Sequence, residues 1–418
     1  MNIWINNPFD NLEEEGARPQ RYAMLSAELV RRGHAVVWWT SAFSHVHKAL
    51  RVGTDGRTLP PSYTNDAGVL MRLLETRPYR SNVSPSRVLS HKAYAETWFK
   101  TACADVRDGA LARPDIILSS LPPLATHRVA LRLRERFGSR LFVDIQDAWP
   151  EAFEGLLPLP APLAKLAYRT FFASARETAR RAFLTADKIT GVGKSYLDLA
   201  AASGTAAPLG EFRLGITDAA DAVTPVTDGP VRVVYAGNMG KSYDLVTLIR
   251  AVIDLEKTRP GFIRLDLAGT GPDERKLRSL ADGCAAVQFH GFLRKDTLEA
   301  LLRTSEIGVV PMFDRSFVAV PNKIADYAAS GLAVVNCLTG ETRDLVASAA
   351  AGAWYPAGDV GRLAEVLAQM ASDRTALLQM RRNALALAKR EFLASSIYPA
   401  LCDFLLDSER DCENGFGH

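Results

Sequence analysis

Short apolar runs alternate with amphipathic segments along almost the whole chain of 418 residues. In the first half, candidate strands and candidate helices follow one another, the strands at residues 3–5, 36–39, 116–118 and 141–143 and the helices at residues 21–32, 126–137 and 165–186. The alternation restarts at residues 231–235 and continues to about residue 371, before a long helix at residues 374–391. This pattern is typical of parallel sheets that are covered by helices on both faces. The sequence therefore predicts an α/β fold.

The texture of the chain changes between residues 200 and 228, where small residues, glycine, proline and aspartate dominate. Such a composition indicates a connection between domains. The chain is also long enough for two domains with separate cores. We therefore expect an N-terminal domain at residues 1–210, a second domain at residues 211–390 and a tail at residues 391–418.

The composition excludes several classes of protein. Hydrophobic residues make up 48% of the chain and charged residues 23%, as in a soluble globular protein. The net charge of +3 is too small to indicate nucleic-acid binding, and no apolar run approaches the roughly 18–20 residues of a membrane span. The N-terminus lacks a signal-peptide pattern, and the five cysteines have neither disulfide nor zinc-site spacing. These features predict a cytoplasmic protein without a nucleic-acid partner or a metal site.

Residues 307–345 carry the clearest indication of a binding site. An apolar run ends at Pro311, Pro321 opens a short amphipathic segment, and Gly331 closes it before the next apolar run. Proline at a helix start and glycine just past its end are the expected punctuation of a short helix. The N-terminus of such a helix offers free backbone N–H groups to a phosphate, and Asp326 offers a carboxylate to a ribose diol. The pattern favours a site for a nucleotide diphosphate.

This segment resembles the donor-site signature of family-4 glycosyltransferases. The resemblance continues in YAGNMGKSYDLVTLIRAV (residues 235–252), LDLAGTGPDERKL (265–277) and VQFHGFLRKDTLEALL (287–302), and in the first half in RYAMLSAELVRRGHAVVWWTS and FVDIQDAWPE. It implies the GT-B fold, in which two Rossmann-like, doubly wound domains face a cleft and the last helices cross back onto the first domain. It also implies a nucleotide-sugar donor, a UDP- or GDP-sugar, bound in the second domain without a metal ion.

The second domain opens with the sequence Gly-Asn-Met-Gly-Lys at residues 237–241. Glycine lets the backbone approach a ligand closely, although an ordinary strand-to-helix turn also explains these residues. The resemblance implies that Lys241 and the backbone of Gly237, Asn238 and Gly240 bind the diphosphate. Relatives often carry a second basic residue here, and Lys323 is the candidate replacement.

The family has a pair of glutamates, whose positions here are Val318 and Asp326. The resemblance implies that Asp326 binds the donor, and that backbone groups near Pro321 and Asn322 hold the sugar in place of a carboxylate at position 318. The residues alone also allow Asp326 to be a helix-stabilising charge. By the same resemblance, backbone groups of Gly291, Phe292 and Leu293 meet the nucleobase, although these residues also suit a plain apolar turn.

On the acceptor side, residues 7–18 leave the first strand in a loop, and such loops border the ligand crevice of doubly wound sheets. Gly16 and Arg18 are candidate acceptor or phosphate contacts. His45 begins a cluster with His47, Lys48 and Arg51, which reads as a basic rim for a phosphorylated acceptor rather than as a metal site. Asp147 follows the strand at residues 141–144 and is a candidate to orient or deprotonate an acceptor hydroxyl, the alternative being a cap of the following turn.

Residues 165–194 hold seven basic and two acidic residues among aromatic and aliphatic ones. A basic amphipathic helix can lie on an anionic membrane, and many related enzymes use lipid-linked acceptors. A surface helix with a core-facing apolar stripe is the alternative. Peripheral membrane contact is therefore an open expectation.

Together these features predict a retaining glycosyltransferase, of hexosyl or N-acetylhexosaminyl type, that acts in surface polysaccharide or glycoconjugate synthesis. It would transfer the sugar to a hydroxyl of a sugar or lipid-linked acceptor, with Asp147, Lys241 and Asp326 as its catalytic candidates and with no cofactor beyond the donor. Two alternatives remain, a nucleotide-sugar epimerase of the same fold and a non-catalytic nucleotide-sugar-binding protein.

Overall fold

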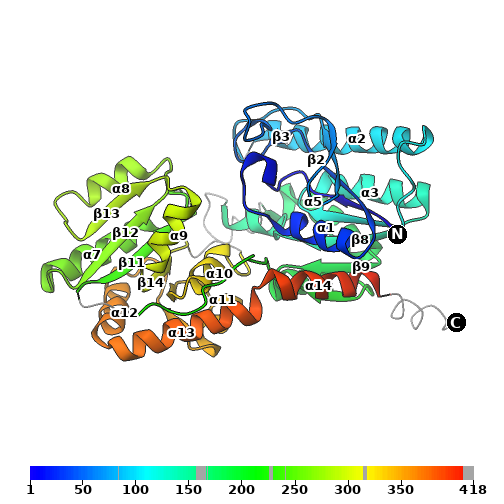
Figure 1. The fold of residues 1–418 in the computed structure, drawn as a ribbon. Coiled ribbons are helices and arrows are strands. Elements are labelled where there is room, and N and C mark those ends of the chain that lie inside the picture. Colours follow the sequence, from blue (N-terminus) through cyan, green and yellow to red (C-terminus); the bar gives the residue numbers. More distant parts are fainter. Residues whose placement is uncertain are drawn as a thin grey trace. The chain divides into compact units, whose positions relative to one another are not determined.

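The computed structural model describes residues 1–82, 84–156, 166, 168–225, 229–240, 242–313 and 318–407. The chain forms two compact units, each of which we describe by itself. Unit 1 comprises Met1–Gly215 and the chain from Ala394 onward, whereas unit 2 comprises Ile216–Leu393. In Figure 1, unit 1 holds the blue to green elements and the red helix α14, and unit 2 holds the elements from green to orange.

Unit 1 is built on an eight-stranded sheet with the order β10-β9-β8-β7-β1-β2-β6-β5. Its strands are β1 (Asn2–Asn6), β2 (Ala35–Ser41), β5 (Ser62–Thr64), β6 (Leu70–Leu74), β7 (Ile116–Leu121), β8 (Arg140–Ile145), β9 (Lys188–Gly191) and β10 (Leu209–Glu211). All neighbours pair in parallel except β5 and β6. A small hairpin of β3 (Phe43–Ser44) and β4 (Ala49–Leu50) follows β2.

Helices cover both faces of this sheet. They are α1 (Arg21–Arg31), α2 (Pro85–Arg107), α3 (Leu124–Phe137), α5 (Ala173–Thr185), α6 (Lys194–Ala201) and α14 (Ala394–Leu406), with 3-10 turns at Glu13–Glu15 and Glu151–Leu156. Successive residues of a strand face opposite sides of a sheet. Ile3 and Ile5 of β1 accordingly lie in one hydrophobic cluster, and Trp4 between them lies in another.

Helix α14 belongs to unit 1 although it comes last in the chain. Its side chains Tyr398, Leu401, Cys402 and Leu405 are buried in the same cluster as Ile3 and Leu25. The guanidinium group of Arg32 pairs with Asp403 at 2.5 Å. The chain therefore leaves unit 1 after Gly215 and re-enters it at Ala394.

A buried charge network, which was not predicted from the sequence, also holds unit 1 together. Asp144 of β8 accepts two hydrogen bonds of 2.8 Å from Arg21, one of 2.7 Å from the Tyr22 hydroxyl and one of 2.6 Å from Thr190. Burial alone would raise the pKa of Asp144, but Arg21 and these hydrogen bonds lower it below its usual value. The network ties α1, β8 and β9 to one another.

Unit 2 contains a six-stranded, wholly parallel sheet with the order β13-β12-β11-β14-β15-β16. Its strands are β11 (Val231–Ala236), β12 (Ile263–Ala268), β13 (Val287–Gly291), β14 (Ile307–Val310), β15 (Ala333–Asn336) and β16 (Gly352–Trp354). Its helices are α7 (Leu245–Thr258), α8 (Glu274–Leu280), α9 (Lys295–Arg303), α10 (Asn322–Ala329), α11 (Glu341–Ser348), α12 (Val360–Ser372) and α13 (Arg374–Glu391). The central strands β14 and β15 are buried along their whole length, as their aliphatic sequences require.

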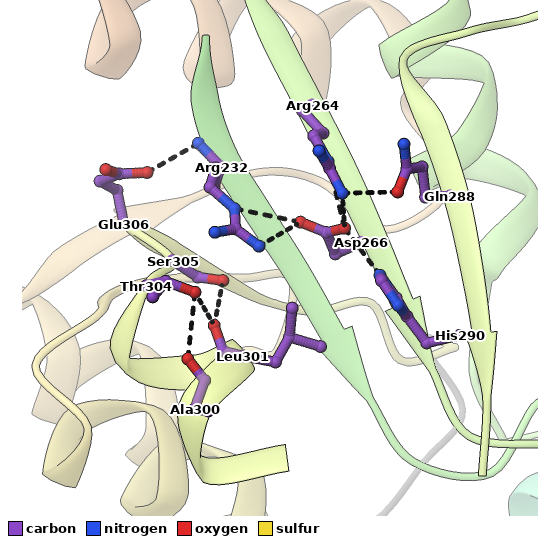
Figure 2. Close-up of polar contacts among 10 residues, drawn as sticks. All are labelled: Arg232, Arg264, Asp266, Gln288, His290, Ala300, Leu301, Thr304, Ser305 and Glu306. Carbon is purple, nitrogen blue, oxygen red and sulfur yellow. Dashed lines mark hydrogen bonds and ion pairs between the residues drawn. The ribbon is translucent and has the colours of Figure 1, made fainter. Parts of the chain in front are cut away.

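Towards the β13 edge of this sheet, the core is polar (Figure 2). Asp266 in the middle of β12 has no exposed surface, and its carboxylate accepts from Arg232 of β11 at 3.3 Å, Arg264 at 3.2 Å and His290 of β13 at 2.7 Å. These three side chains are each about one third exposed or less. The network connects three adjacent strands through one buried charge.

Candidate functional site

The order in which the strands are added to the unit 2 sheet reverses between β11 and β14. The strands β12 and β13 lie on one side of β11, whereas β14, β15 and β16 lie on the other. Ligands of open α/β sheets bind at the carboxyl ends of the strands beside such a switch point. The loop that follows β11 contains the predicted donor residues 237–240, and the loop that follows β14 leads to Pro321 and the first turns of α10, which contain the others.

Three glycine-containing loops meet at this edge. The Gly237 N–H donates to the Ala268 carbonyl at 2.9 Å, Met239 N–H donates to Thr270 at 2.9 Å, and Gly269 N–H donates to Gly291 at 2.7 Å. Gly269 has φ of +122°, and a Cβ there would lie 1.9 Å from the Gly237 carbonyl oxygen. Only glycine allows this approach, so the turn at Gly269 requires a glycine.

Lys323 brings the two sides of the switch point together. Its ammonium group donates to the Ala236 carbonyl and lies 4.9 Å from the ring centres of Tyr235 and Tyr243. A Cβ on Gly237 would lie 2.0 Å from this ammonium group. The structure thus places Lys323 beside the 237–240 loop, where a second cation was expected.

Helix α10 begins as the sequence indicates. Pro321 is its N-cap, Asn322 is its first residue and is exposed, and Gly331 follows with φ of +73°. Tyr327 anchors the helix because its hydroxyl accepts from the Ala236 N–H at 2.9 Å, and a Cβ on Gly308 would collide with its ring. Asp326 lies half-buried on this helix, and Val318 is exposed.

Two parts of the predicted donor site lie outside the described residues. These are Lys241, the predicted phosphate-binding lysine, and residues 314–317 before Val318. The described residues form a cavity of about 190 Å³, lined by Gly240, Tyr243, Lys276 and Phe313 among others. Lys276 and Phe313 were not singled out in the sequence.

The exit of β13 combines one exposed and one packed side chain. Gly291 has φ of +66°, Phe292 is 78% exposed, and Leu293 packs against the unit 2 core. An exposed phenylalanine beside a loop that contacts Gly269 is available for a flat ligand.

In unit 1, the predicted acceptor residues fall into different environments. Gly16 and Arg18 are exposed, and Gly16 adopts φ of +78° at the end of a 3-10 turn. Arg51 is buried and pairs with Glu15 at 2.5 Å. The expectation that Arg51 belongs to a basic rim is therefore wrong, because its charge is consumed inside the fold. His45, in contrast, lines a small open hollow of about 10 Å³.

This unit 1 hollow lies beyond the carboxyl ends of β1, β2 and β6. Its lining includes Phe9, His45, Tyr79, His91 and Tyr94. Burial, reinforced by Arg87 and other nearby cations, lowers the pKa of His45 to about 4, and burial with Arg87 and His45 lowers that of His91 to about 3. Both histidines are therefore neutral at pH 7.

Asp147 is linked to the rim of the unit 1 hollow through Trp149. Its carboxylate accepts from the Trp149 indole N–H at 3.0 Å, and the Trp149 ring lies 6.0 Å from that of His91. Burial raises the pKa of Asp147, which makes the carboxylate a better proton acceptor. The indole bond is also what a turn-capping residue would show, so the geometry fits both interpretations.

The predicted basic segment at residues 165–194 is described only in part, since 157–165 and 167 lie outside. Residues 166 and 168–171 are helical, and after a turn at Phe172 helix α5 continues from Ala173, so the described residues agree with the expected helix. Phe171 is 83% exposed, but Tyr168 and Phe183 are buried and Lys188 is almost fully buried within the sheet. Within the described residues, none of the helices combines the length and apolar character that crossing a bilayer requires.

The described residues also contain no group of three His, Cys, Asp or Glu side chains arranged to hold a metal ion.

Comparison with known proteins agrees with this geometry. Residues 230–373, which contain the switch point of unit 2, match the family described as glycosyl transferases group 1. The whole chain superposes on a sucrose-phosphate synthase from Thermosynechococcus elongatus, with a TM-score of 0.70, 12% identity and coverage of 97% of this chain and 98% of that one. The fold is GT-B.

Two further GT-B structures are informative. One is Anabaena Alr3699/HepE in complex with UDP and glucose, with a TM-score of 0.65 at 14% identity and coverage of 96% and 98% of the two chains. The other is WaaG, a glycosyltransferase involved in lipopolysaccharide biosynthesis, with a TM-score of 0.62 at 14% identity and coverage of 97% and 100%. No curated protein matches the chain. The GT-B fold predicted from the sequence, with its two Rossmann-like parts, is therefore confirmed.

Proposed function

We propose that this GT-B protein transfers a sugar from a nucleotide-diphosphate donor to a hydroxyl group, in the synthesis of a surface polysaccharide or glycoconjugate. The observation that carries the proposal is the meeting of the Gly237 loop, Lys323 and the start of α10 at the switch point of unit 2. This meeting lies within the part that matches the glycosyl transferases group 1. Because Alr3699/HepE is described with UDP-glucose, a UDP-sugar is the first donor to test.

In this proposal the free N–H groups of α10 and the ammonium groups of Lys323 and Lys241 stabilise the departing diphosphate. A helix N-terminus together with fixed cations can supply this charge without a metal ion. Asp326 accepts from the ribose, and attack of the acceptor on the same face of the sugar needs no enzyme nucleophile. Transfer should therefore continue in excess chelator, and loss that magnesium or manganese restores would refute this step.

The test is calorimetric titration of UDP and GDP, followed by transfer assays with the sugars of the base that binds. Asp326→Ala should weaken nucleotide binding by roughly 1–3 kcal/mol, the scale of a lost charge-assisted hydrogen bond. The control is Asp254→Ala, an exposed aspartate of α7 that pairs with Lys257, which should bind as the parent does. Equal affinity of the parent and Asp326→Ala for every diphosphate would refute the donor-site assignment.

Val318 favours one alternative, because the family's first glutamate is missing there. A non-catalytic nucleotide-sugar-binding protein would bind UDP but would not transfer a sugar.

We assign Asp147 to the acceptor hydroxyl, so Asp147→Asn should lower turnover by about 10²–10⁴-fold with UDP affinity unchanged. Turnover equal to the parent with a lower melting temperature would make Asp147 a cap instead.

We also propose a lipid-linked acceptor and reversible contact of α5 and Phe171 with an anionic membrane. Phe171 and Leu166 are exposed, and Arg169 and Arg176 lie near them in the sequence. Basic residues near such a surface contribute about 1 kcal/mol each before screening. Flotation with anionic vesicles should therefore decrease as salt rises, and equal flotation with neutral vesicles would contradict the proposal.

A further inference from the structure

Two cations, Arg87 and Lys48, contact side chains that line the unit 1 hollow. Arg87, in the first turn of α2, donates from Nη1 to the Asn82 carbonyl at 2.7 Å. Lys48 donates from Nζ to the Asn82 side-chain oxygen at 2.5 Å and lies 4.7 Å from the Tyr79 ring centre. Like charges that share one neutral residue repel each other, so this arrangement costs free energy unless an anion offsets it.

No carboxylate in the described part of the chain forms an ion pair with either of these cations. Neither Arg87 nor Lys48 forms an ion pair within 4.0 Å among the described residues, whereas Arg21, Arg51 and Arg72 in the same unit each do. Burial and the neighbouring Arg87 lower the pKa of Lys48, and burial lowers that of Arg87. The two histidines of the hollow are neutral and add no charge, and Asp147 is the carboxylate whose charge acts on Arg87, at a longer range than an ion pair.

The guanidinium group of Arg87 is held in a fixed orientation. It lies 4.7 Å from the ring centre of Trp149 and 5.5 Å from that of Phe9, and its Nε donates to His91 Nε2 at 3.3 Å. Arginine presents a planar fork that matches a carboxylate or a phosphate. An arginine orientated before the ligand arrives loses less entropy on binding.

The backbone of Lys48 is strained. Lys48 has φ of +55°, a conformation that only one other non-glycine residue, Ala350, adopts in the described part of the chain. Residues held in this region cost free energy and cluster at functional sites. In this conformation Nζ donates to the carbonyl of His45 and lies over the ring of Tyr79, two residues that line the hollow.

We propose that Arg87 and Lys48 form an oxyanion site that recognises a carboxylate or phosphate on the acceptor. This inference rests on the proposed function, since it assumes that unit 1 receives the acceptor. It adds to that function the class of acceptor, an anionic one, and two residues that select it. Trp149 connects this oxyanion site to Asp147, so the anion would be bound close to the candidate base.

The test is calorimetric titration of the full chain, at low salt, with glucose 1-phosphate, glucuronate and glucose. Both anionic sugars, or one of them, should bind at least about 10-fold more tightly than glucose. Arg87→Gln and Lys48→Gln should each weaken that binding by about 10- to 100-fold, the effect of a lost hydrogen bond to a charged group. Tighter binding of glucose 1-phosphate or of glucuronate shows whether the site recognises a phosphate or a carboxylate on the acceptor.

The matched control is Arg107→Gln at the other end of α2, about 30 Å away at 1.5 Å per residue. Arg107 is 72% exposed, and its loss should leave all three affinities unchanged. Arg87→Lys keeps the charge but loses the fork, and should bind with intermediate affinity. Melting temperature measured on each preparation confirms that the variants are folded.

Equal affinity of the parent for all three sugars, no binding of either anion, or binding by Arg87→Gln as by the parent would overturn the proposal. Binding that UDP displaces and that survives Arg87→Gln belongs to unit 2 and would also overturn it. UDP affinity is measured separately and should not change in Arg87→Gln. If the parent does not bind UDP, the proposed function is refuted. The sugar titrations would still decide whether the oxyanion site exists.

Discussion

At the scale of single residues, Asp10 predicts how unit 1 responds to pH. Its side chain is 8% exposed, and burial raises its pKa to about 6 despite the Tyr22 N–H and nearby Arg51. Between pH 4 and 6 the folded state binds more protons than the unfolded state, so this group lowers stability as pH rises. Asp10→Asn removes this carboxylate. The free energy of unfolding of the variant minus that of the parent should therefore increase by roughly 2–3 kcal/mol from pH 4 to pH 7.

Urea unfolding at both pH values measures this difference. Asp55→Asn, an aspartate that is 60% exposed, should shift stability by the same small amount at either pH. The buried histidines contribute equally to the pH dependence of the parent and of the variant, so their contribution cancels in the difference. A stability difference between Asp10→Asn and the parent that does not depend on pH would show that Asp10 titrates normally.

At the scale of elements, the Asp266 network joins β11, β12 and β13 (Figure 2). Asp266→Asn leaves two arginines without their shared carboxylate. Breaking a buried pair costs about 3–5 kcal/mol, and partial exposure of the arginines reduces this to roughly 2–3 kcal/mol. Asp254→Asn on α7, whose ion pair is exposed, should cost less than about 0.5 kcal/mol. Equal stability of the two variants in urea unfolding would contradict a structural role for this network.

Much of the element order could be predicted from the sequence. The apolar runs mark β1, β2, β7, β8, β11, β14 and β15, and Pro321 and Gly331 mark the two ends of α10. Local chemistry determines these features, so spacing reveals them. The partners Arg87, Tyr79 and Trp149 meet only because the fold brings residues from different loops together. The antiparallel pairing of β5 with β6 depends on tertiary packing in the same way.

At the scale of the whole molecule, unit 1 depends on a helix from the far end of the chain. The four buried side chains Tyr398, Leu401, Cys402 and Leu405 contribute roughly 6–12 kcal/mol at about 1.5–3 kcal/mol each. This equals the whole stability of a typical domain. A chain that ends at Leu393 should therefore have a protease-sensitive unit 1 and a protected unit 2, as mass spectrometry of the fragments would show.

A chain that ends at Asp407 is the matched control, because it keeps all of α14 (Ala394–Leu406). It should resist protease as the full chain does. Protection of unit 1 in the chain ending at Leu393 would mean that α14 is dispensable.

The two ends of unit 2 lie next to each other. Ile216 donates its N–H to the Phe392 carbonyl at 2.8 Å and bridges to Leu393, so the unit begins and ends at one point. A segment with adjacent ends can be exchanged without moving the rest of a protein. Recombination could thus replace the proposed donor half by exchanging one continuous stretch of the gene, since unit 2 is a single chain segment. A host enzyme would then acquire a new sugar in one event, while its acceptor half, closed by its own last helix, stayed as it was.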